Sequence, residues 1–187
     1  GDIPTFYTAF ALMGLASAGL VLHRGDAEAT RAGRIYLALA MVGEVLILSG
    51  FVFLTVAGGT TRIAELHRGV FSLPALLLLL AGFGIKAGAL SLHFWLPLAH
   101  PAAPVPASAV LSGAMIKAGL LGWIRFLPLG EATMPVCGFT LISAGLGAAF
   151  LGTFVGVAQK NPKAVLAYSS ISQMGIIMTG LDLCSCL

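Results

Sequence analysis

Charged residues are scarce in this chain, and their scarcity excludes most classes of soluble protein. Only 9% of the 187 residues are Asp, Glu, Lys or Arg, whereas 58% are hydrophobic. A soluble domain carries about 25% charged residues. The apolar runs are long enough to cross the hydrocarbon core of a bilayer, which takes about 20 residues. The composition therefore indicates a multi-pass integral membrane protein in contact with the lipid bilayer.

The chain also lacks a basic patch and a cysteine framework. The net charge is +3 and the basic residues are dispersed over short loops, so we expect no nucleic-acid partner, which would require a clustered patch. The cysteines, Cys137, Cys184 and Cys186, have neither zinc-type nor disulfide-type spacing. We recognise no ligand set for a flavin, a quinone, an iron–sulfur cluster or nickel, and therefore expect no metal, no cofactor and no redox centre in this chain.

Apolar segments separated by short polar turns predict an all-α transmembrane helical bundle with about six spans. The segments lie at about 4–22, 34–57, 72–86, 106–127, 134–158 and 164–181. The sequence starts directly in a helix and stops abruptly, so we interpret residues 1–187 as a single transmembrane domain cut from something longer. Excess positive charge marks cytoplasmic loops, and this predicts a cytoplasmic location for the turns that hold Arg24, Arg31, Arg34, Lys160 and Lys163.

Prolines interrupt the chain after the third apolar segment. Pro97, Pro101, Pro104 and Pro106 follow Lys86 within a short stretch. Proline removes a backbone N–H and clashes with the preceding helical turn, so we predict a helix broken by these prolines. Non-helical backbone at membrane depth is tolerated only inside protein or beside a water-filled cavity. The break therefore marks a candidate functional region.

Three ionisable residues interrupt the apolar spans. Lys86 lies roughly 20 Å along its predicted helix, and Lys117 and Glu44 lie roughly 15 Å along theirs, at about 1.5 Å per residue. A charge near the middle of the bilayer is by default a functional group. Desolvation lowers the pKa of a buried lysine, whereas a nearby carboxylate raises it. A lysine subject to both effects can gain or lose a proton when a neighbouring charge moves. We predict proton transfer through these three side chains; the alternative is a buried ion pair that only fixes helix packing.

Two histidines flank the predicted break. His93 and His100 could shuttle protons, because imidazole titrates near neutral pH. The alternative is that both rings anchor at the lipid headgroups. A haem-ligand pair, as in a b-type cytochrome anchor, is disfavoured because the spacing across Pro97 does not place both rings on one regular helical face.

Several stretches of the chain carry a resemblance to a known family. They read FALMGLAS (10–17), GIKAG (84–88), LHFWLPLAHPAAPVPASAVLSG (92–113), MIKAGLLGWIR (115–125) and QKNPKAVLAYSSISQMG (159–175). These stretches resemble the antiporter-like subunits shared by respiratory complex I, membrane-bound hydrogenases of the formate hydrogenlyase type and Mrp cation/proton antiporters. The motif LPLAHPAAP most resembles the corresponding motif of the hydrogenase-linked branch.

The resemblance implies an inverted-repeat transporter fold of roughly fourteen helices, of which this chain would form about the fifth to the tenth. It implies that Lys86 is the central switching lysine and that Lys117 is a relay lysine on a broken helix. It also implies that His93 and His100 match positions around the loop between those helices.

One departure from the family pattern concerns the partner of Lys86. The family usually has Trp-Glu where this chain has Phe10-Ala11, and that glutamate partners the switching lysine. Ala11 cannot ionise, and Glu44 is the remaining carboxylate at membrane depth in this part of the chain. We hypothesise that Glu44 is the relocated partner of Lys86.

The residues and the resemblance together predict a function. We expect a proton-translocating, non-redox membrane subunit of a redox-driven complex of the hydrogenase or NADH:quinone oxidoreductase type. Its partners would be other membrane and peripheral subunits, in a bacterial or archaeal plasma membrane. Two alternatives stay open: a Na⁺/H⁺ antiporter subunit of the Mrp type, and a structural membrane subunit that does not pump.

Overall fold

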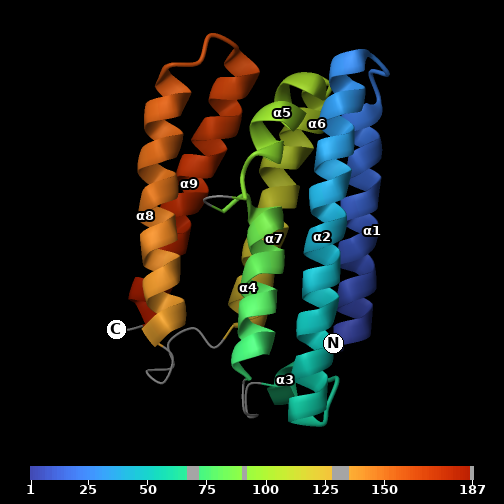
Figure 1. The fold of residues 1–187 in the computed structure, drawn as a ribbon, viewed down its shortest axis with the longest axis vertical. Helices are drawn as coiled ribbons and strands as arrows, with labels where there is room; N and C mark the ends of the chain where they lie inside the picture. Colours follow the sequence, from blue (N-terminus) through green and yellow to red (C-terminus); the bar gives the residue numbers. More distant parts are fainter. Residues whose placement is uncertain (67–71, 90–91, 128–134, 186–187) are drawn as a thin grey trace.

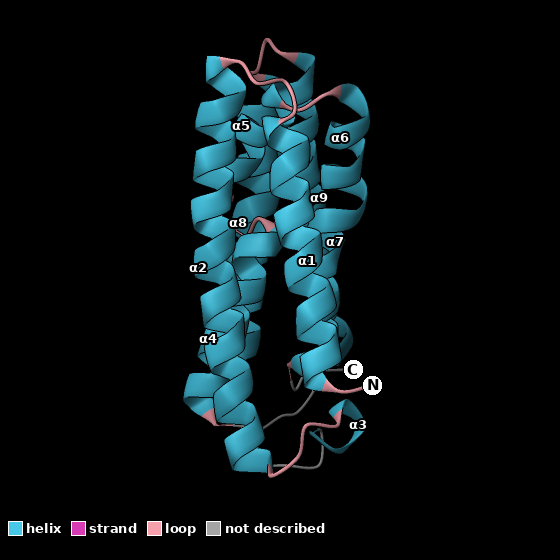
Figure 2. Ribbon diagram, turned by 90° about the vertical axis from the view of Figure 1, so that its right-hand side faces the viewer, coloured by secondary structure: helices cyan, strands magenta, loops and turns pink. Residues whose placement is uncertain are grey.

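The computed structural model describes residues 1–66, 72–89, 92–127 and 135–185, with side chains described except at 135–138, 140 and 182–185. In these ranges the regular elements are helices, and the long ones run side by side along the long axis of the molecule (Figure 1, Figure 2). They are α1 (Ile3–Leu22), α2 (Ala27–Gly58), α3 (Ile63–Leu66), α4 (Leu73–Ala87), α5 (Trp95–Ala102), α6 (Val105–Val110), the π-helical segment η1 (Leu111–Met115), α7 (Ile116–Phe126), α8 (Pro135–Val157) and α9 (Pro162–Ser185). The predicted all-α fold is confirmed.

The long helices are apolar enough to span a bilayer. Among the described residues, four segments meet this criterion: α1, α2, the continuous rod Val105–Phe126 formed by α6, η1 and α7, and Pro162–Leu181 of α9. Leu73–Ala87 and Leu141–Val157 are shorter apolar helices. Large apolar side chains such as Phe154 and Val157 point away from the protein, as they do where lipid is the solvent. The helices agree with the prediction of about six spans.

Helix α2 begins earlier than the sequence pattern indicates. We predicted its start near position 34, whereas the helix begins at Ala27. Asp26 is the N-cap: its carboxylate accepts a hydrogen bond of 2.7 Å from the backbone N–H of Ala29, which satisfies one of the free donors at the helix start. The predicted start was wrong because the polar first turns of α2 resemble a loop, whereas the cap extends the helix beyond the apolar run.

A glycine ends α4 inside the bundle. Gly88 has a left-handed backbone (φ 67°), and the N–H of Ala89 bonds to the carbonyl of Gly84 at 2.9 Å, which is the pattern of a Schellman cap. The indole N–H of Trp95 donates a 2.8 Å hydrogen bond to the Ile85 carbonyl. The chain therefore leaves α4 before it reaches the prolines and re-enters helix at Trp95.

The prolines shape the following turn instead. Pro97 lies in the first turn of α5, where a missing N–H leaves no helical bond unmade. Pro101 lies near the end of α5, Pro104 is the N-cap of α6 and Pro106 lies in its first turn. The interruption between α4 and α5 thus starts at Gly88, and the prolines set the corner between α5 and α6.

The helices form three groups across the molecule. The hairpin of α8 and α9 lies on one flank, α1 and α2 lie on the other, and α4 to α7 lie between them (Figure 1). Glycines allow close approach within the groups: a Cβ at Gly152 of α8 would lie 2.8 Å from the Tyr168 carbonyl of α9. The α1–α2, α5–α6 and α8–α9 turns lie at the same end of the bundle (Figure 1, Figure 2). That this end faces the cytoplasm stays a prediction.

Candidate functional site

Lys86 lies in the last turn of α4 with a side chain that is only 2% exposed. The carboxyl end of a helix carries a partial negative charge from its free carbonyls, and this charge favours a nearby cation. Gly88 ends the helix directly after Lys86. The local fold therefore places an ammonium group at a helix end inside the protein.

Glu44 of α2 pairs with this ammonium group. Its Oε1 atom lies 2.8 Å from Lys86 Nζ, and the Glu44 side chain is 16% exposed. Among the described residues, no further hydrogen bond reaches Lys86 Nζ or the Glu44 carboxylate. A lysine ammonium can donate three hydrogen bonds, so the pair keeps unused hydrogen-bonding capacity. The two groups compensate each other's charge while leaving positions for another polar partner.

Helix α1 supplies an aromatic ring and a gap beside this pair. Lys86 Nζ lies 5.2 Å from the centre of the Phe10 ring, within the range of a cation–π contact. Gly14 lies one turn further along, where a Cβ atom would collide with Lys86 Nζ. Ala11 is half-buried on the same helix. The site therefore takes its carboxylate from α2, and α1 leaves room for the lysine.

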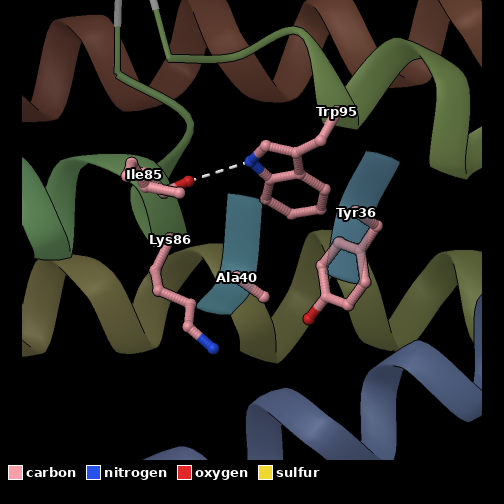
Figure 3. Close-up of a pocket in the computed structure, with 5 residues that line it drawn as sticks. All are labelled: Tyr36, Ala40, Ile85, Lys86 and Trp95. Atoms are coloured by element: carbon pink, nitrogen blue, oxygen red, sulfur yellow. Dashed lines mark hydrogen bonds between the residues drawn. The ribbon is translucent and has the colours of Figure 1, made fainter. Parts of the chain in front are cut away.

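A narrow cleft lies next to the pair (Figure 3). Tyr36, Ala40, Ile85, Lys86 and Trp95 line it, and the space between them is too narrow for a water molecule. The rings of Tyr36 and Trp95 meet edge to face with centroids 5.1 Å apart. The cleft is consequently dry, and proton exchange at Lys86 through this cleft would need it to widen.

Tyr36 is a site residue that our sequence reasoning missed. Its hydroxyl donates a 3.1 Å hydrogen bond to the Gly14 carbonyl, beside the lysine–glutamate pair. Tyr36, Ala40 and Glu44 follow each other at intervals of four, a spacing that puts them on one face of a helix. That spacing was the available signal, but an amphipathic tyrosine is too common to be distinctive without the position of α1.

Lys117 occupies a different environment from Lys86. It is the second residue of α7, midway along the continuous rod Val105–Phe126 rather than on the interrupted pair α4–α5. Its side chain is exposed, and its Nζ donates a 2.8 Å hydrogen bond to the Ser112 carbonyl in η1. The Ser112 hydroxyl lies 2.8 Å from the hydroxyl of Ser170 on α9. Lys117 is thus linked to a polar contact between helices.

The two histidines make contacts other than those of the lysine–glutamate pair. His93 precedes α5, is buried, and stacks on Phe94 with ring centroids 5.0 Å apart. His100 of α5 is 1% exposed, and its Nδ1 lies 2.6 Å from the Ser108 hydroxyl. Both rings are therefore buried in the protein. Among the described residues no group of three His, Cys, Asp or Glu side chains could hold a metal ion.

Comparison with known proteins decides the family. Residues 1–185 match the family described as NADH:quinone oxidoreductase/Mrp antiporter, transmembrane. The chain belongs to this family. The chain is similar to the hydrogenase-4 component B of Escherichia coli, with 37% identity over 92% of this chain and 27% of that protein's length.

Two further relatives are subunits of respiratory membrane complexes. The NADH-quinone oxidoreductase subunit N of Desulforamulus reducens is 34% identical over 97% of this chain and 40% of its own length. A chain of the membrane-bound sulfane sulfur reductase, an archaeal respiratory membrane complex, superposes with a TM-score of 0.90 at 26% identity over 97% of this chain and 39% of that one. These antiporter-like relatives are parts of multisubunit membrane complexes, and the chain spans 27% to 40% of the curated relatives' length.

Proposed function

We propose that this chain is the core of a proton-translocating membrane subunit in a redox-driven complex of the hydrogenase or NADH:quinone oxidoreductase type. Protons would be exchanged by Lys86 with Glu44, and relayed by Lys117, His93 and His100 with the help of water. The family membership and the names of the relatives support this proposal. We propose as partners the other membrane and peripheral subunits of such a complex, in a bacterial or archaeal plasma membrane.

The observation that carries the proposal is the Lys86–Glu44 pair inside the bundle. Its two charged atoms lie 2.8 Å apart, and the lysine is almost fully buried. Replacing a buried ion pair by apolar residues is often neutral or stabilising, so packing alone is a weak reason to retain one. A proton that leaves Lys86 or reaches Glu44 would destroy the charge balance of the pair. A change in the protonation of either residue would therefore strongly alter the electrostatic energy of the pair.

The dry cleft beside Lys86 suggests how proton transfer could be controlled. A proton path needs hydrogen-bonded groups or water in contact with the lysine, and Tyr36 and Trp95 line the narrow cleft beside the Lys86 side chain (Figure 3). Movement of either ring would admit water to Lys86. We propose that transfer alternates between this dry form and a hydrated one.

The decisive experiment is a Glu44→Gln substitution in the full-length subunit within its complex, reconstituted into liposomes. We expect proton transport to fall by about tenfold or more, since removal of a proton-transferring group has effects of this size or larger. Glu28→Gln is the matched control, because Glu28 is an exposed carboxylate on the same helix. Electron transfer, assayed in parallel, reports whether the complex itself is intact.

The transport measurements distinguish a proton-translocating subunit from an Mrp-type antiporter and from a structural subunit. Proton transport at the parent rate in Glu44→Gln would contradict the role of the pair. Transport that depends on Na⁺ and persists without an electron donor would favour an Mrp-type antiporter, which the family description also names. A parent complex that moves no protons would overturn the proposal in favour of a structural subunit.

A further inference from the structure

Lys163 of α9 contacts the end of the neighbouring helix α5. It is the second residue of α9 and is half-buried. Its Nζ donates a 2.6 Å hydrogen bond to the backbone carbonyl of Ala103. Ala103 is the C-cap residue of α5, has extended backbone and is fully buried. A lysine from the α8–α9 hairpin thus caps a helix in the middle group of the bundle.

The physical effect of this contact follows from the chemistry of helix ends. The last carbonyls of a helix have no partner within that helix, and their partial negative charge attracts cations. In the buried corner between α5 and α6, water has limited access to the Ala103 carbonyl. The ammonium group of Lys163 supplies both a hydrogen bond and a charge, so it should stabilise the geometry of this corner.

The same corner carries the contact between His100 and Ser108. His100 lies on α5 and Ser108 on α6, and the 2.6 Å contact between His100 Nδ1 and Ser108 Oγ spans the turn at Ala103. Among the described residues the other ring nitrogen of His100 has no hydrogen-bond partner. The position of the imidazole therefore depends on the shape of the turn.

Other charged groups approach this corner from the opposite side. Arg24, in the α1–α2 turn, lies with Nη1 3.4 Å from the Pro101 carbonyl, and its second guanidinium nitrogen pairs with Asp26 at 2.7 Å. Arg24 is exposed and already compensated by Asp26. Lys163 makes the shorter and more buried contact, which makes it the stronger candidate for holding the turn.

We propose that Lys163 is a positioning residue for proton transfer: by capping α5 from α9, it holds the α5–α6 turn in the shape in which His100 meets Ser108. The link to proton transfer rests on the proposed function, whereas the capping role does not. Lys163 also ties the α8–α9 hairpin to this corner. Because α9 also packs against α5, a shift of the hairpin would reach the α5–α6 turn through this hydrogen bond and through that packing.

Hydrogen exchange of the full-length subunit in its complex tests the capping role. The backbone N–H groups of Ala103 and Ser108 donate on either side of the turn, to the Ala99 carbonyl at 2.9 Å at the end of α5 and to the Pro104 carbonyl at 2.8 Å at the start of α6. We expect Lys163→Met to accelerate their exchange by about tenfold, which is the effect of losing a charge-assisted hydrogen bond. Lys160→Met is the matched control, because Lys160 is an exposed lysine in the same turn. Equal exchange in both variants would overturn the proposal.

Proton transport tests the link to function. We expect Lys163→Met to lower transport several-fold, Lys163→Arg to restore most of it, and Lys160→Met to leave it unchanged. In combination with His100→Gln, Lys163→Met should add little further loss, since both act on one group. Fully additive losses, or no rescue by arginine, would contradict the positioning role. If Lys86→Met transports like the parent, the proposed function fails, and the exchange experiment still decides the capping role.

Discussion

The tetrapeptide Ile-Lys-Ala-Gly occurs twice in this chain, at 85–88 and at 116–119, and the two copies adopt different structures. In the first copy Gly88 takes a left-handed backbone (φ 67°) and ends α4. In the second copy Gly119 stays within α7. A Cβ at Gly119 would lie 2.6 Å from the backbone nitrogen of Ala87, so the second copy packs directly against the first.

The burial and the bonding partners of the two lysines follow from this difference. Lys86, at the end of a helix, is buried and pairs with Glu44. Lys117, within a rod that continues through a π-helical segment, is exposed and bonds to the Ser112 carbonyl. Segments of π-helix often occur at functional sites. The comparison teaches that one lysine is compensated by a carboxylate and the other by a main-chain carbonyl.

The largest expected effect is a difference in the free energy of unfolding between variants of the two lysines. Lys86→Met leaves the Glu44 carboxylate buried without its partner and should lower the free energy of unfolding by about 3–5 kcal/mol. Lys117→Met leaves no carboxylate without a partner, because Lys117 bonds to the main-chain carbonyl of Ser112, and it should lower the free energy of unfolding much less than Lys86→Met does. Thermal unfolding of the detergent-solubilised protein measures both. The double variant Lys86→Met with Glu44→Leu should recover most of the loss; equal effects of the two single variants would refute the distinction.

An intermediate effect is expected at the glycine that faces Lys86. Gly14→Ala forces the Lys86 ammonium group to move and should lower the free energy of unfolding by about 1–3 kcal/mol, as overpacking does. Gly19→Ala, on the same helix, meets no atom within 4 Å and should be neutral or slightly stabilising. The same unfolding assay applies. A neutral Gly14→Ala would show that the pair has free space around it.

The smallest expected effect concerns the polar contact near Lys117. Ser170→Ala removes the hydroxyl that meets Ser112 at 2.8 Å and should lower the free energy of unfolding by about 0.6 kcal/mol, the average for such contacts between membrane helices. Ser169→Ala is the control, because Ser169 is exposed. A loss several times larger would mean that Ser112 and Ser170 belong to a more extensive buried network around Lys117.

Much of the fold could be predicted because it depends on local properties of the sequence. Long apolar runs indicate membrane-spanning helices, and the predicted ranges agree with the structure to within a few residues for α1, α4 and α9. The start of α2 was missed because a single capping side chain, Asp26, decides it. The interruption was expected at the prolines, but it begins at Gly88, where a left-handed glycine ends α4. Pro97 is tolerated because it lies in the first turn of α5.

The candidate site was less accessible to prediction. The types and approximate depths of Lys86 and Glu44 are evident in the sequence, and their contact was hypothesised from the absence of a carboxylate at Ala11. The contributions of Gly14 and Tyr36 depend on how α1 packs against α2 and α4. Lys163 carries no local sign that distinguishes it from Lys160, because only one of the two lies within reach of the end of α5.

By itself the sequence determined that this protein is a helical membrane protein with ionisable groups inside its spans. The reason is that the hydrophobic effect and the demand for satisfied backbone hydrogen bonds act on every residue of an apolar run. Only the tertiary structure decided which Ile-Lys-Ala-Gly copy ends a helix, which lysine is buried and which carboxylate it meets. Those outcomes depend on contacts between distant segments, and two identical tetrapeptides contain no information about them.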